Sequence, residues 1–150
     1  MRATTIYDSK GDPYTADRLF YKIRDNEYIA VIGFTTDGDI FGGFYHVAVT
    51  KQDKEYYDPN IFAFSFISQG KCETPQRFTV KRGMKEKANV NFFKNNPDGF
   101  VYFWAVESGF FLGNEMSFSY CHNLTQTFDG IGDTTLTGKT GVETANEHHC

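Results

Sequence analysis

The sequence is poor in cysteine and proline, and it contains no long apolar run. Its 3 cysteines, Cys72, Cys121 and Cys150, are widely spaced. This is too few for a disulfide framework, and an odd count favours a reducing compartment over secretion. No segment approaches the roughly 18 consecutive apolar residues that a membrane-spanning helix requires, and the first residues carry no apolar signal segment. We therefore expect a cytoplasmic protein without a transmembrane segment.

The chain also lacks an excess of positive charge. Its 15 Lys and Arg residues are outnumbered by 19 Asp and Glu residues, which gives a net charge of -4. Binding to the phosphates of nucleic acids needs clustered Lys and Arg side chains. We therefore expect no nucleic-acid partner.

Aromatic residues, by contrast, are abundant, with 16 Phe and 9 Tyr. Aromatic and β-branched side chains pack well on pleated surfaces, and 150 residues suit one hydrophobic core. We expect a mainly β fold with minor α, in the form of a two-layer antiparallel β-sandwich with a short N-terminal helix packed on it. The domain should span residues 1–137, and the polar residues 138–150 should form a flexible C-terminal tail.

The stretch 29–49 is typical of a β-hairpin. Two apolar runs flank Asp37-Gly38, a dipeptide that favours a two-residue turn. Such a turn would place Phe34 opposite Phe41. Both faces of the two strands are apolar, which predicts central strands covered on both sides, with Phe34, Phe41 and Phe44 buried.

Other segments show the periodicity of a helix or a strand. Thr15 is a candidate N-cap for a helix with an apolar stripe at Leu19, Phe20 and Ile23. We predict further strands at 4–7, 61–67, 78–80, 92–93, 100–106 and 116–120. In the segment 61–67, Phe recurs at every second position and forms a stripe that points one way.

No motif for a cofactor is complete. Gly138-Lys139-Thr140 resembles part of a phosphate-binding loop, but Asp133 stands where the first glycine is required, so we interpret it as a solvated loop. The histidines and cysteines lack the paired spacing of a metal site. We expect neither a metal nor a cofactor, and we interpret His46 as a hydrogen-bonded structural residue.

Two cysteines have neighbours that suit thiol chemistry. Cys72 follows Lys71, whose charge could lower the pKa of the thiol, and Cys121 precedes His122. A loop cysteine without a role is the simpler interpretation, and adjacency along the chain does not create catalytic geometry. A thiol-based redox protein that uses Cys72 or Cys121 is therefore the alternative to a protein without enzymatic activity.

One charge cluster lies between predicted strands. It consists of Lys81, Arg82, Lys85 and Lys87, with Glu86 among them. Such a run commonly faces water without further function. The alternative hypothesis is that the cluster docks an acidic surface on a protein partner or a phospholipid.

The order of these segments resembles the TLDc domain family. The resemblance lies in the start at 6–9, the early helix ending 19–23, the hairpin 37–44, the Phe-rich strand 61–66 and the glycine-flanked segment 109–113. It covers roughly residues 4–120, and we expect the chain to lack the family's closing apolar strand. The resemblance implies a β-sandwich in a non-enzymatic protein-interaction domain. It also implies a role in oxidative-stress protection or in regulation of the vacuolar proton-pumping ATPase, through a subunit of its peripheral sector. The family brings no catalytic residues.

Overall fold

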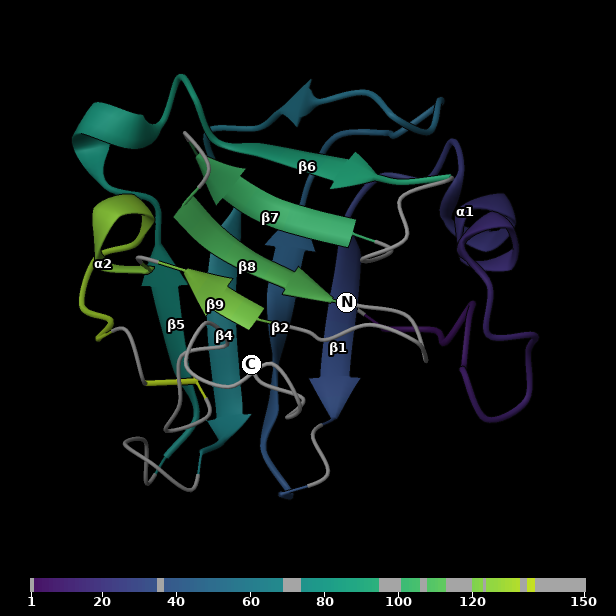
Figure 1. Cartoon of the computed structure of the whole chain (residues 1–150), viewed down its shortest axis with the longest axis horizontal. Helices are drawn as coiled ribbons and strands as arrows, with labels where there is room; N and C mark the ends of the chain where they lie inside the picture. The colour runs from purple at the N-terminus through teal and green to yellow at the C-terminus, as the bar shows by residue number, and fades with distance from the viewer. Residues whose placement is uncertain are drawn as a thin grey trace.

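Two antiparallel β-sheets face each other, and a short helix lies at either end of this sandwich (Figure 1). The computed structural model describes residues 2–34, 37–68, 74–94, 101–105, 108–112, 120–122, 124–132 and 135–136. Within these ranges the fold is mainly β with minor α, which confirms the predicted fold class. The predicted tail at 138–150 lies outside the described residues.

Strands that are near in sequence form the first sheet, in the order β1–β2–β4–β5. Its strands are β1 (Ile29–Phe34), β2 (Ile40–Tyr45), β4 (Phe62–Ile67) and β5 (Gln76–Thr79). The second sheet has the order β3–β6–β7–β8–β9. Its strands are β3 (Tyr56–Tyr57), β6 (Asn89–Phe92), β7 (Val101–Ala105), β8 (Ser108–Leu112) and β9 (Tyr120–His122).

Three short helical segments flank the sheets. In α1 (Ala16–Ile23), the predicted cap is confirmed, because the hydroxyl of Thr15 accepts a hydrogen bond from the backbone N–H of Arg18 at 3.1 Å. Leu19 and Ile23 bury the apolar side of this helix in the core. The others are the 3-10 helix η1 (Arg82–Met84) and α2 (Leu124–Thr127). Within the described residues, no helix has the length and apolar character needed to cross a membrane.

The core lies between the inner faces of the two sheets. Tyr45 of β2 and Phe92 of β6 meet across the layers, with ring centroids 5.9 Å apart and a near edge-to-face arrangement. Burial raises the pKa of the Tyr45 phenol, so this side chain stays neutral at physiological pH. Phe41, Ala63 and Phe78 extend the same inner face, and each is almost fully buried.

The register of the hairpin differs from the prediction by one residue. Phe34 pairs with Ile40, not with Phe41. A two-residue turn on Asp37-Gly38 would require Phe34 to face Phe41, whereas the pairing of Phe34 with Ile40 leaves residues 35–39 between the paired positions. The connection therefore holds an odd number of residues, and the predicted two-residue turn was wrong.

The expectation that both faces of this hairpin are covered was also wrong. β2 is a central strand, but β1 forms an edge of the first sheet. Ile29 and Val31 turn toward the core, whereas Ile32 and Phe34 point the other way and are 44% and 74% exposed. The prediction that Phe41 is buried is confirmed, and Phe44 is half-buried.

Two smaller predictions also need correction. Residues 4–7 do not form a strand, and they pair with no strand in the described part of the chain. The strand expected at 92–93 instead ends at Phe92 and begins at Asn89. In β6 the polar Asn89 and Asn91 alternate with the inward-facing Val90 and Phe92, a pattern that the polar sequence before them obscured. The predicted strand at 116–120 lies mostly outside the described residues.

Candidate functional site

The predicted cationic residues lie together on one exposed turn. Residues 81–87 comprise Lys81, η1 and the three residues that follow it, and we call this segment the basic turn. Its backbone is anchored, because the N–H of Lys81 donates to the carbonyl of Thr127 at 2.8 Å. The N–H groups of Lys87 and Ala88 both donate to the carbonyl of Met84, whose side chain packs against the core. The fold thus holds the basic turn in a defined conformation.

The charges of the basic turn are presented to solvent. Arg82, Lys85 and Lys87 are exposed, and Lys81 is half-buried. Among the described residues, none of these four cations forms an ion pair. Glu86 is the one acidic residue in the segment. The basic turn is therefore a local concentration of positive charge in a chain whose net charge is -4.

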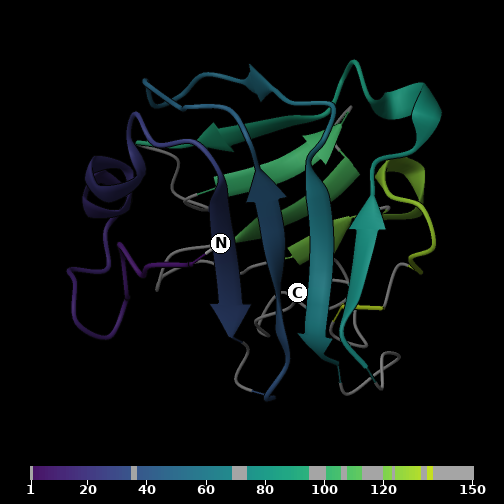
Figure 2. The ribbon, with the colours of Figure 1, turned by 180° about the vertical axis from the view of Figure 1, so that it is seen from behind.

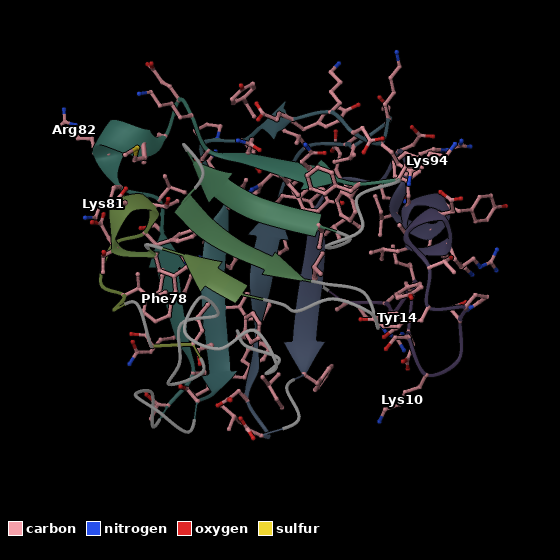
Figure 3. All side chains as sticks on the ribbon, viewed as in Figure 1. Lys10, Tyr14, Phe78, Lys81, Arg82 and Lys94 are labelled. Carbon is pink, nitrogen blue, oxygen red and sulfur yellow. The ribbon has the colours of Figure 1, made fainter. Side chains whose placement is uncertain are left out.

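The basic turn occupies one end of the molecule. Figure 3 shows Lys81 and Arg82 beside α2, and Lys10 and Lys94 at the opposite end of the sandwich, near α1. The chain runs directly from β5 into the basic turn, as Figure 2 shows at the edge of the first sheet. The basic turn is therefore adjacent to the surface of the first sheet at its β5 edge.

The first sheet presents an apolar surface on the side turned away from the second sheet, which we call the outer face. Figure 2 looks directly onto this side of strands β1, β2, β4 and β5. Ile32 and Phe34 of β1 and Phe66 and Ile67 of β4 are exposed on it, between 44% and 74%. These four residues form the apolar end of the outer face.

A β-bulge creates part of this apolar end. The pairing between β2 and β4 shifts between Ile40 and Phe41, so that Ile40 pairs with Ile67 and Phe41 pairs with Ser65. Phe66 is the extra residue on the bulged strand. A bulge bends its strand and redirects side chains. Phe66 and Ile67 are consequently both exposed, although consecutive strand residues normally point to opposite faces.

Aromatic rings continue along the outer face. Phe44 and Phe62 stack with centroids 5.1 Å apart and an interplanar angle of 9°, and Phe64 and Phe66 follow along β4. The guanidinium of Arg77 lies 5.0 Å from the centroid of the Phe62 ring. Such contacts add a modest stabilisation to the burial of the rings. The outer face is therefore an ordered aromatic surface with a cation at its β5 side.

His46 and Asp58 form a polar pair at one end of these rings. Oδ2 of Asp58 accepts a hydrogen bond from the backbone N–H of His46 at 2.6 Å and lies 3.1 Å from Nδ1 of the same residue. Oδ1 of Asp58 accepts from the backbone N–H of Asn60 at 2.9 Å. The Asp58 side chain is only 2% exposed. His46 is thus hydrogen-bonded, as predicted, and the pair fixes the connections that follow β2 and precede β4.

Replacing Asp58 by alanine should lower the free energy of unfolding by about 2 kcal/mol, because the backbone N–H groups of His46 and Asn60 would lose a buried acceptor. Urea unfolding measures the effect. Asp8→Ala is the matched control, since this exposed carboxylate also accepts a backbone N–H, from Lys10, but water can replace it. Equal losses in the two variants would contradict the proposed role of the buried pair.

The cysteines and the Gly138-Lys139-Thr140 segment, which the sequence also indicated as candidate sites, form no site in the described part of the chain. Cys72 and Cys150 lie outside the described residues, as do Gly138, Lys139 and Thr140. Cys121 lies in β9, where its backbone pairs with Phe110. In the described ranges, no group of three or more His, Cys, Asp or Glu residues is placed to hold a metal ion.

Comparison of the chain with models of protein families, with curated proteins and with solved structures finds no match. The resemblance to TLDc domains therefore remains a prediction from the sequence.

Two features of the surface were not predicted. The Phe stripe of 61–67 was recognised, but its place on the outer face was not: there Phe64 is buried and Phe66 is exposed. The pairing of Asp58 with His46 joins residues 12 positions apart. The Asp58-Pro59-Asn60 sequence indicated only the turn, in which Asp58 accepts the N–H of Asn60.

Proposed function

We propose that this chain is a non-enzymatic protein-interaction domain that binds an acidic surface of another protein through the basic turn. The observation that carries the proposal is the convergence of Lys81, Arg82, Lys85 and Lys87 on one anchored, exposed turn without ion pairs among the described residues. Complementary charge increases the rate and the specificity of association. In a chain of net negative charge, such a cluster selects an acidic partner.

The resemblance of the sequence to TLDc domains supports a narrower form of this proposal. The partner is then a subunit of the peripheral sector of the vacuolar proton-pumping ATPase, and the domain acts in the cytoplasm. Its role is protection from oxidative stress, regulation of the pump, or both. This narrower form depends on the resemblance alone, whereas the use of the basic turn depends on its geometry and charge.

Charge reversal tests the role of the basic turn. The variant Arg82→Glu/Lys85→Glu/Lys87→Glu should bind purified peripheral-sector subunits about tenfold or more weakly than the original chain, because three attractions become repulsions. Calorimetric titration at two salt concentrations measures the affinity, which should fall as salt rises. All three side chains are exposed, so the fold should survive.

A second triple variant provides the control. Lys10→Glu/Lys51→Glu/Lys94→Glu makes the same change in net charge with exposed residues outside the basic turn. It should retain most of the affinity. Equal weakening by both variants would show a general effect of net charge and would overturn the role of the basic turn. Absence of binding by the original chain would overturn the proton pump as the partner.

A further inference from the structure

The apolar end of the outer face is unusual for a surface exposed to water. Ile32, Phe34, Phe66 and Ile67 lie on neighbouring parts of one sheet, since Phe34 and Ile67 both flank Ile40 through the strand pairing. Isolated exposed apolar residues need no explanation, but a contiguous group marks an interaction site. A bulge that adds Ile67 to this group, beside Phe66, increases the exposed apolar area.

We propose that the outer face docks an amphipathic segment of a partner protein, with its apolar side chains on this end and a carboxylate on Arg77. The inference rests on the proposed function as an interaction domain, and it adds a second contact surface and the chemistry of the partner. Arg77 pairs with Phe64 on β4, and its guanidinium lies over Phe62. A partner that covers these rings must also cover the guanidinium.

The charge of Arg77 decides between possible occupants. A buried guanidinium is costly unless an acidic group pairs with it. None of the outward-facing side chains described on β1, β2, β4 and β5 carries a carboxylate. A second copy of this chain stacked on the same face would therefore bury two guanidiniums without an acidic partner. An apolar surface that bears carboxylates satisfies both requirements.

The hairpin argues against a lipid surface. Asp37 is exposed in the connection that immediately follows Phe34 and β1. Insertion of Phe34 into a bilayer would carry this carboxylate toward the hydrocarbon, at a cost of several kcal/mol for a group that remains ionised. A protein segment can contact Phe34 and leave Asp37 in water.

The basic turn continues the cationic side of this surface. The chain leads from Arg77 through β5 directly into Lys81 and Arg82 (Figure 2). The apolar end and the β1 side carry Ala30, Ile32 and Phe34 instead. A segment that lies across the outer face therefore places its acidic residues toward β5 and its apolar residues toward β1 and the end of β4.

A designed peptide tests the inference without knowledge of the natural partner. The probe is a fluorescently labelled amphipathic helix of leucine and glutamate, compared with a twin in which lysine replaces glutamate. The acidic peptide should bind about tenfold or more tightly than the lysine twin, although the protein itself has a charge of -4. Fluorescence anisotropy measures both affinities.

Substitutions on the outer face test whether the peptide binds there. Phe34→Ser and Phe66→Ser should each lower the affinity for the acidic peptide by about tenfold. Both side chains are exposed enough for the fold to tolerate the change. Arg77→Glu should reverse the preference in favour of the lysine twin. Ile6→Ser is the matched control, because Ile6 is 37% exposed outside the outer face and should leave binding unchanged.

The outcomes separate this inference from the proposed function. Loss of peptide binding in the variants of the outer face, with retention in the triple variant of the basic turn, supports the inference. If only the triple variant of the basic turn loses peptide binding, the inference is overturned and the proposed function remains intact. If sedimentation experiments show a dimer, and Phe34→Ser abolishes that dimer, the outer face binds a second copy of this chain and the inference is overturned. Binding to phosphatidylserine vesicles that needs Phe34, without peptide binding, would overturn it as well.

Discussion

Replacing Phe41 by alanine should lower the free energy of unfolding by about 3–5 kcal/mol. Phe41 lies on the inner face of the central strand β2 and is 1% exposed. Its removal would leave a cavity next to rings and aliphatic chains that cannot collapse fully, so the loss exceeds the transfer free energy of the side chain alone. Urea unfolding followed by circular dichroism measures the change, provided that the transition is two-state.

Phe34→Ala is the matched control in the same hairpin. Phe34 is 74% exposed, so its removal should change the free energy of unfolding by no more than about 0.5 kcal/mol. The two variants delete the same atoms from adjacent strands, and the expected difference comes entirely from burial. A similar loss in both variants would contradict the assignment of Phe34 to the outer face.

This pair of residues shows how far the sequence can predict the fold. Apolar runs on both sides of Asp37-Gly38 correctly predict two paired strands, and the capping Thr15 correctly predicts the start of α1. The sequence cannot decide which face of the hairpin is inside, because both faces are apolar. One-sided burial normally reveals itself by alternation with polar residues, and an apolar interaction surface removes that signal.

The register depends on the length of one turn. Asp37-Gly38 suits a two-residue turn in composition, but the pairing of Phe34 with Ile40 leaves an odd number of residues in the connection and excludes that turn. A shift of one residue changes every cross-strand pair in a hairpin. Local sequence therefore predicts that a turn exists, whereas the packing of β2 against β4 and the core selects its length.

The candidate surfaces differ in how far they could be predicted. The basic turn is a contiguous run in the sequence, so its four cations were identifiable, and the structure adds only their anchoring and exposure. The outer face combines residues from four strands with a bulge that exposes Phe66 and Ile67 together. No local pattern encodes such a bulge, because Phe66 continues the period-2 stripe of its strand without interruption.

Gly42→Ala should lower the free energy of unfolding by about 3 kcal/mol or prevent folding. Gly42 lies in the middle of β2, between β1 and β4. A Cβ atom there would lie 2.7 Å from Cζ of Phe64, 3.0 Å from the carbonyl carbon of Val31 and against the carbonyl oxygen of Val31. Gly11→Ala and Gly83→Ala are the controls, because a Cβ at either position meets no atom within 4 Å.

A double variant separates the two contacts of Gly42. The end of the Phe64 ring can move, because its side chain rotates, whereas the Val31 carbonyl belongs to the backbone of an adjacent paired strand. Relief of that contact would require β1 to separate from β2. Gly42→Ala should therefore cost nearly as much in a Phe64→Leu background as in the original chain. Full rescue by Phe64→Leu would show instead that Gly42 serves only to seat the Phe64 ring on the outer face, and that β1 tolerates the displacement.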